Sequence, residues 1–99
     1  MEKQKPQQIQ IRSSENDLKG AYSNVMQVTH TQEEFVLDFF NIMGQTGVLS
    51  SRVILSPSHF KRMVQAMEDN LKKYEEHFGL ISPSQSPVSP PQEIGFRPQ

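Results

Sequence analysis

Three histidines are the first candidates for chemistry, because an imidazole binds metal ions or transfers protons near neutral pH. His30 falls in a predicted turn, whereas His59 and His77 fall at the two ends of a predicted helix. At 1.5 Å per residue, about 27 Å of helix separates these last two side chains. No two histidines share a helical face, and the chain has no cysteine to supply a thiolate ligand. We therefore expect surface histidines, no metal site and no cofactor.

Carboxylates and nucleophiles form no catalytic pattern. Glu33 and Glu34 adjoin a predicted hairpin turn, where two carboxylates are better explained as solvated than as an acid–base pair. Asp38 is the one carboxylate inside an apolar strand, and an ion pair with Arg12 or Arg52 is its simplest interpretation. The sequence contains neither a Gly-x-Ser-x-Gly elbow nor a glycine-rich phosphate-binding loop. We therefore expect a protein that is not an enzyme.

Basic and aromatic side chains suggest a second kind of chemistry, the binding of single-stranded nucleic acid. Tyr22 and Phe40 are suited to stacking on bases. On the predicted helix, however, basic residues are interleaved with acidic ones, the basic set being Lys61, Arg62, Lys72 and Lys73 and the acidic set Glu68, Asp69, Glu75 and Glu76. The formal net charge of −1 gives no bulk attraction to phosphates. Nucleic acid is therefore kept only as an alternative partner.

The composition sets limits on the class of protein. A chain of 99 residues forms at most one domain, and without cysteines it has no disulfide to stabilise a small core. It has no apolar run approaching the ~18 residues that a membrane span needs. The N-terminal sequence "MEKQKPQQ" lacks the apolar stretch of a secretory signal. We expect a cytoplasmic protein that does not enter a membrane.

Four segments alternate with the period of a β-strand. They are "IQIRS" from residue 9, "AYSNVMQVTH" from residue 21, "EFVLDFFNIM" from residue 34 and "GVLSSRVILS" from residue 47. The last three are joined by short polar connections, and the "GQTG" connection has glycines that accept positive φ. Short connections favour antiparallel neighbours, because parallel strands need a long crossover. A four-stranded antiparallel meander is predicted.

A long helix follows the last strand. Ser56 is placed to cap it, Pro57 suits its first position, and Gly79 suits its end, so the predicted range is 57–78. Apolar residues at spacings of three and four form a single stripe, which consists of Phe60, Met63, Val64, Met67, Leu71, Tyr74 and Phe78. The helix would be about 33 Å long, which matches a ten-residue strand.

Together these elements predict an α+β domain over residues 9–79, with the helix packed along one face of the sheet. The expected core places Ile9, Ile11, Met26, Val28, Phe35, Leu37, Phe39, Val53 and Leu55 under Phe60, Met63, Val64, Met67, Leu71 and Tyr74. Leu49 is expected on the same face as Val53 and Leu55. Residues 1–8 are expected to be a disordered lead. Residues 80–99, with three Ser-Pro pairs, are expected to be a disordered tail.

The opposite face of the predicted sheet is left with nothing in the chain to cover it. Its apolar residues are Val25, Val36, Phe40, Ile42 and Ile54, with Arg12, Asp38 and Arg52 among them. An apolar patch of this kind usually marks an interaction surface. We expect a homo-oligomer interface, with a partner protein or an unfolded client chain as alternatives. Tyr22 and Asn24 are possible binding residues, or they satisfy a strand end.

Several short motifs make the chain similar to a family of small prokaryotic proteins catalogued as domain of unknown function 3467. The motifs, within residues 20–79, are Gly20-x-Tyr22-x-Asn24, Glu34-Phe35-x-Leu37-Asp38-Phe39, Ser51-Arg52-Val53, Ser56-Pro57 and Asn70 ahead of Tyr74-Glu75. The resemblance implies no activity. A looser analogy, in topology alone, is to export chaperones, whose subunits join an antiparallel meander to a helix. The expected function is therefore a non-catalytic interaction or oligomerisation protein, with chaperone-like binding of unfolded chains as the alternative.

Overall fold

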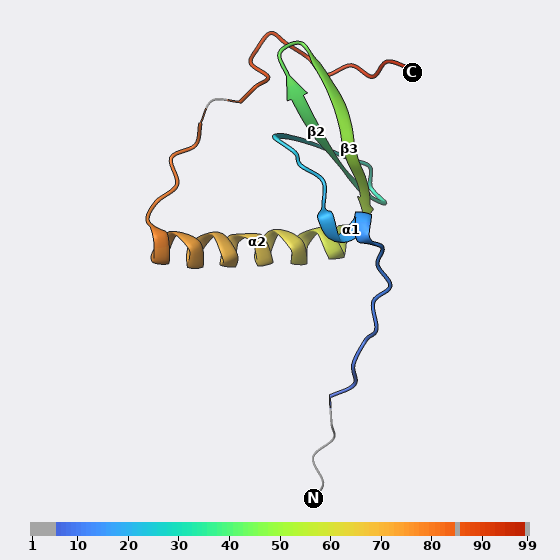
Figure 1. The fold of residues 1–99 in the computed structure, drawn as a ribbon, viewed down its shortest axis with the longest axis vertical. Helices are drawn as coiled ribbons and strands as arrows, with labels where there is room; N and C mark the ends of the chain where they lie inside the picture. Colours follow the sequence, from blue (N-terminus) through green and yellow to red (C-terminus); the bar gives the residue numbers. More distant parts are fainter. Residues whose placement is uncertain (1–5, 85, 99) are drawn as a thin grey trace, which may run out of the picture.

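The computed structural model describes residues 6–84 and 86–98. Residues 1–5 of the expected disordered lead, and residues 85 and 99 of the expected tail, lie outside the described residues. The elements follow in the order α1 (Glu15–Lys19), β1 (Val25–His30), β2 (Phe35–Met43), β3 (Thr46–Leu55) and α2 (Pro57–Phe78) (Figure 1). Within the described ranges, no helix is both long enough and apolar enough to cross a membrane.

Over the described residues, the sheet has three antiparallel strands in the order β1-β2-β3. Each pair is joined by a short turn, and Gly44 takes a φ of +65° in the turn between β2 and β3. This confirms the α+β class, the antiparallel pairing and the C-terminal helix. The predicted fourth strand is wrong.

The segment expected to form that strand lies away from the sheet. Ile9 and Ile11 are 82% and 80% exposed. The helix α1 follows at once, because Ser14 accepts a hydrogen bond from Asp17 N and the Asp17 carboxylate accepts one from Ser14 N. This capping box starts a helix where the sequence pattern predicts only a polar connection. Two isoleucines bury too little apolar area to hold the segment on the sheet edge.

A bulge in β3 changes which side chains share a face. Phe39 pairs with Ser51 but Phe40 pairs with Leu49, so Ser50 is an extra residue on β3. The Ser50 hydroxyl donates to the carbonyl oxygen of Tyr22 at 2.8 Å. Because of this extra residue, Leu49 lies on the face of Phe40. The expectation that Leu49 shares the face of Val53 and Leu55 is therefore wrong.

The helix α2 has the predicted bounds. The Ser56 hydroxyl accepts a hydrogen bond from His59 N at 3.2 Å, and Pro57 is the first helical residue. At the other end Gly79 takes a φ of +97°, and its N–H donates to the carbonyl oxygen of Glu75. Both ends therefore follow from local backbone chemistry.

The position of α2 differs from the expected one. Phe60 stacks on Phe35 with ring centroids 4.0 Å apart, but beyond this first turn the helix runs away from the sheet (Figure 1). Only Ser56 separates β3 from α2. One residue spans at most about 3.6 Å, whereas packed layers lie about 10 Å apart. The chain cannot both reverse its direction and move out of the plane of the sheet within that length.

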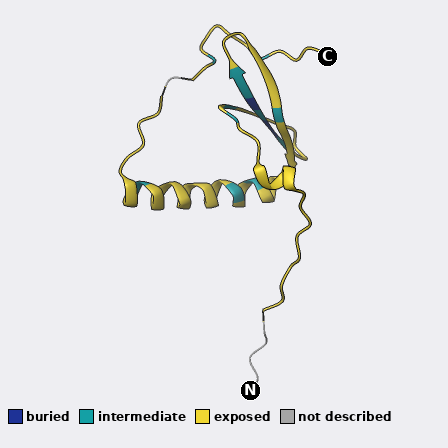
Figure 2. Cartoon of the chain, in the orientation of Figure 1, coloured by how far each residue is buried: buried dark blue, intermediate teal, exposed yellow. Residues whose placement is uncertain are grey.

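The core is correspondingly small. Leu37 and Leu55 are buried, but Met26, Val28 and Val53 on the same face are 45%, 39% and 39% exposed. Figure 2 shows the buried residues gathered on β2 and the end of β3, with α2 almost wholly exposed. The predicted layer of helix on sheet is therefore not formed within one chain.

Candidate interaction surfaces

Most residues of the predicted interaction surface do share one face of the sheet. Val25 pairs with Phe40, Val36 with Ile54, and Asp38 with Arg52, so each pair lies side by side. We call this surface the Phe40 face, made of Val25, Val36, Asp38, Phe40, Ile42, Leu49, Arg52 and Ile54. Arg12 does not belong to it, because it is an exposed residue in the segment before α1.

An ion pair lies at the centre of the Phe40 face. Arg52 Nε donates to Asp38 Oδ1 at 2.6 Å, and Arg52 Nη2 donates to Asp38 Oδ2 at 3.0 Å. Asp38 is 5% exposed, while the Arg52 side chain is about half exposed. Hydrogen bonding to the carboxylate, followed by its charge, raises the pKa of Arg52 above its ordinary value. The pairing of Asp38 with Arg52 rather than Arg12 settles the two alternatives for this carboxylate.

The C-terminal segment covers part of the Phe40 face. Phe96 lies against Phe40 with ring centroids 5.8 Å apart, and the Arg52 guanidinium carbon lies 5.4 Å from the centre of the Phe96 ring. Phe40 is only 5% exposed. The expectation that nothing in the chain covers this face is therefore wrong. A sequence signal was available, because Ile94 and Phe96 are two apolar residues that interrupt a polar, proline-rich segment.

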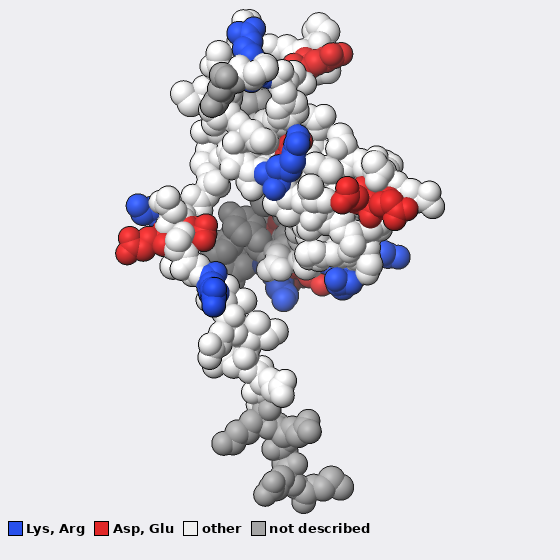
Figure 3. All heavy atoms as spheres, turned by 90° about the vertical axis from the view of Figure 1, so that its right-hand side faces the viewer, with Lys and Arg blue, Asp and Glu red and all other residues white. Residues whose placement is uncertain are grey.

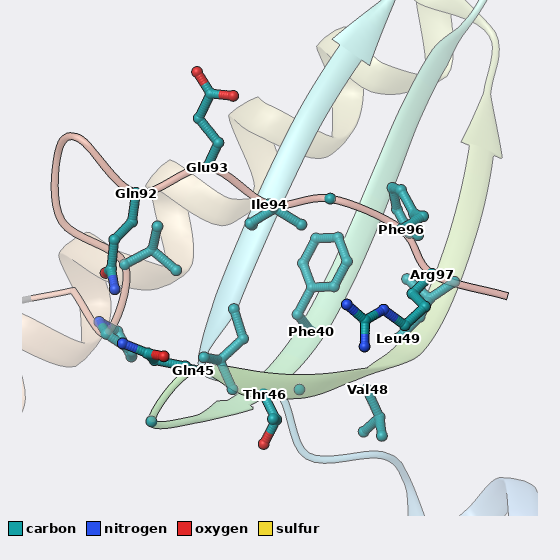
Figure 4. A pocket seen from close by; sticks show the side chains of 16 residues that line it. Phe40, Gln45, Thr46, Val48, Leu49, Gln92, Glu93, Ile94, Phe96 and Arg97 are labelled. Carbon is teal, nitrogen blue, oxygen red and sulfur yellow. The ribbon is translucent and has the colours of Figure 1, made fainter. Parts of the chain in front are cut away.

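Beside this contact the tail and the β2–β3 hairpin enclose an open groove of about 670 Å³ (Figure 4). Phe40, Val48 and Leu49 line it from the sheet, and Ile94 and Phe96 line it from the tail. Ile94 is half-buried, whereas Phe96 remains 60% exposed. The tail therefore lies on the sheet as a loosely held extended segment, and the groove is shaped by both.

Asn24 and Tyr22, the two possible binding residues, have different environments. The Asn24 side chain donates from Nδ2 to Ile42 O and accepts at Oδ1 from Ile42 N, each at 2.9 Å. Both polar atoms are thus engaged in extending the β1–β2 pairing beyond the end of β1. Tyr22 is 72% exposed. The geometry favours the structural interpretation of Asn24 and leaves Tyr22 accessible.

Charge does not gather into a patch of one sign on the side of the molecule seen in Figure 3. Basic and acidic side chains are interspersed there. A surface that binds a nucleic-acid backbone ordinarily concentrates Lys and Arg on one side. Nothing on this side of the molecule therefore favours nucleic acid over protein as the partner.

An uncovered apolar surface runs along α2. We call it the α2 stripe, made of Phe60, Met63, Val64, Met67, Leu71, Tyr74 and Phe78. From the second turn onwards the stripe is open: Val64, Met67, Leu71 and Phe78 are 36%, 56%, 48% and 69% exposed. These are residues that the sequence predicts for the core, a prediction that requires the helix to turn back onto its own sheet.

Comparison with known proteins identifies the family but no relative of known activity. A family model described as Protein of unknown function (DUF3467) matches residues 1–83. The match includes the whole sheet and the α2 stripe, and it ends before the tail residues that cover Phe40. No curated protein and no solved structure matches the chain. By this match over most of its length, the chain belongs to the family of unknown function DUF3467.

Proposed function

We propose that this protein is a non-catalytic interaction protein that self-associates through the α2 stripe. The observation that supports it is the exposure of the stripe from Val64 to Phe78. This exposed part covers most of the 22-residue helix α2. Exposed apolar surface of this extent ordinarily marks a contact with another molecule. The proposal moves the interaction surface from the Phe40 face, where the tail already lies, to the helix.

The small core supports a second copy of the chain as the partner. Among the described residues, the buried apolar side chains are Leu37, Phe40 and Leu55. A domain with so small a core, and without disulfides, gains much of its stability from association. The open sheet face with Met26, Val28 and Val53 adds apolar area next to the start of the helix.

Size-exclusion chromatography with light scattering tests this proposal. The full chain should elute with twice its 11.4 kDa mass at micromolar concentrations. Leu71→Asp places a charge in the middle of the α2 stripe and should give the monomer mass. Gln65→Asp is the matched control, because it adds the same charge on the polar face of the helix and should leave the dimer intact. A monomeric native chain at high micromolar concentration would refute the proposal.

The tail supports a second candidate function, the binding of extended apolar peptides on the Phe40 face. Ile94 and Phe96 already occupy this face as alternate residues of an extended segment. A partner peptide or an unfolded client with the same apolar-x-apolar pattern would compete for it. Phe96→Ala should then increase the suppression of aggregation of an unrelated protein, and Phe40→Asp should abolish it. No suppression by either the native chain or Phe96→Ala excludes this candidate.

A further inference from the structure

We propose that the partner of the α2 stripe is α2 of a second copy, docked antiparallel in a single register. The inference rests on the proposed self-association and specifies its geometry. Within the stripe, the apolar positions follow one another at intervals of four, three, four, three and four residues, at Phe60, Val64, Met67, Leu71, Tyr74 and Phe78. This is the a/d spacing of a coiled coil, and it places these side chains in one seam.

The seam residues are complementary to those of a second copy that runs antiparallel. With Asp69 at the midpoint, Phe60 meets Phe78 of the second copy, Val64 meets Tyr74, and Met67 meets Leu71. The twofold axis generates each of these pairs a second time. Every a/d side chain from Phe60 to Phe78 therefore has an apolar partner. The small Val64 faces the large Tyr74, which is the size pairing that fills a helix interface without voids. The contact is isologous and closes at two chains.

The flanking positions carry complementary charge in the same register. Lys61 lies opposite Glu75 of the second copy, and the twofold axis repeats this pair. Asn70 lies opposite its own copy, and within one chain its Nδ2 donates to the carbonyl oxygen of Ala66 at 2.9 Å. Glu75 Oε2 accepts a hydrogen bond from Ile81 N, which orients the carboxylate at the end of its own helix. Glu68 meets its own copy, and this one like-charge contact opposes the assembly.

A parallel pair lacks these features. It would place Glu68 opposite Met63 and Glu75 opposite Asn70, so no lysine would meet a carboxylate across the seam. It would also place like ends of the two helix macrodipoles next to each other, which is unfavourable. The antiparallel pair places each N-terminus beside a C-terminus, which is favourable. Within one chain the sheet meets the seam at Phe60, which stacks on Phe35, whereas the seam side chains from Val64 to Phe78 remain exposed. The observations therefore favour the antiparallel arrangement.

Single cysteines test the register, because the chain has none of its own. Under mild oxidation of the full chain, Asn70→Cys should form a covalent dimer. Val64→Cys alone should not, because it faces position 74 of the second copy. Along the helix axis, that position lies about 15 Å from position 64 of the second copy. A mixture of Val64→Cys and Tyr74→Cys should form the mixed dimer. Crosslinking of Val64→Cys with itself, and not of Asn70→Cys, would show a parallel pair and overturn the inference.

A charge exchange provides a second readout that does not depend on oxidation. Lys61→Glu should weaken the dimer several-fold, and the double variant with Glu75→Lys should restore it. Glu68→Gln should tighten the dimer several-fold by removing the like-charge contact. Circular dichroism would verify that each variant retains its helix. If the native chain dimerises but the double variant does not recover the native dimer affinity, the register alone is refuted. If the native chain is a monomer, the proposed function is refuted as well.

Discussion

Arg52 on β3 faces Asp38 on β2 and holds its carboxylate with two hydrogen bonds, while the outer side of its guanidinium lies against the Phe96 ring. One side chain thus joins the sheet to the C-terminal tail. Asp38 is 5% exposed and has little access to water, whereas the half-exposed Arg52 remains accessible to water. Loss of the partner should therefore cost more free energy for Asp38 than for Arg52.

Removing the arginine should destabilise the protein more than neutralising the aspartate. Arg52→Ala leaves a buried carboxylate unpaired, which is costly, whereas Asp38→Asn leaves an arginine that water can solvate. Urea denaturation at pH 7 should show the larger loss in the free energy of unfolding for Arg52→Ala. Arg12→Ala is the control and should change nothing. Equal losses for the two variants would contradict the asymmetry.

The tail contact should be weak but measurable. Phe96→Ala removes the ring that covers Phe40, and an aromatic pair contributes about 0.5–1.5 kcal/mol beyond its buried area. We expect the free energy of unfolding to fall by about 1 kcal/mol, at the middle of that range, and the amide of Phe40 to exchange faster with solvent. Leu80→Ala, at an 89% exposed position of the same segment, should leave both quantities unchanged. Unaltered exchange at Phe40 in Phe96→Ala would argue against the contact.

Local signals predicted the three strands and α2 well, missed α1, wrongly added a fourth strand, and predicted the packing poorly. The cap at Ser56, the proline after it and Gly79 define both ends of α2, because each acts through the adjacent backbone. The alternation through Phe35, Leu37 and Phe39 likewise reflects the geometry of one strand. The stripe on α2 shows only that one side of the helix is apolar. It contains no information on whether the covering surface belongs to the same chain.

Two other differences have equally local causes. The bulge at Ser50 shifts the pairing, and no residue type there announces it, so uninterrupted alternation misplaced Leu49. The start of α1 did have a signal, since Ser14 and Asp17 have the spacing of a capping box. The contact between Phe40 and Phe96 joins residues far apart in the sequence. The apolar residues Ile94 and Phe96 signal that the tail makes a contact, but their pattern does not specify which sheet face they cover.

Asn24 should matter for stability rather than for binding. Asn24→Ala removes both hydrogen bonds to the backbone of Ile42 and should lower the free energy of unfolding by about 1 kcal/mol, since the bonds are exposed to solvent. Tyr22→Ala removes an exposed side chain and should stay within about 0.5 kcal/mol. Chemical denaturation of both variants provides the comparison. A larger loss for Tyr22→Ala would indicate that its ring packs on a partner.

The capping box of α1 should respond to acid. Hydrogen bonds from Ser14, first from its backbone N–H and then from its side chain, hold the pKa of Asp17 below its ordinary value of 3.8. Because the pKa is lower in the folded chain, the stabilisation of α1 is fully present above pH 3.8. It is lost as the pH falls through the lower, folded value.

An NMR titration of the Asp17 carboxyl carbon measures this directly. Its midpoint should lie below 3.8, and the amide signals of α1 should change with the same midpoint. Ser14→Ala removes the side-chain half of the capping box and should move the midpoint towards the ordinary value. Ser13→Ala, one residue earlier and outside the box, is the matched control and should leave the titration of Asp17 unchanged. A native midpoint at or above 3.8 would show that the capping box does not persist in solution.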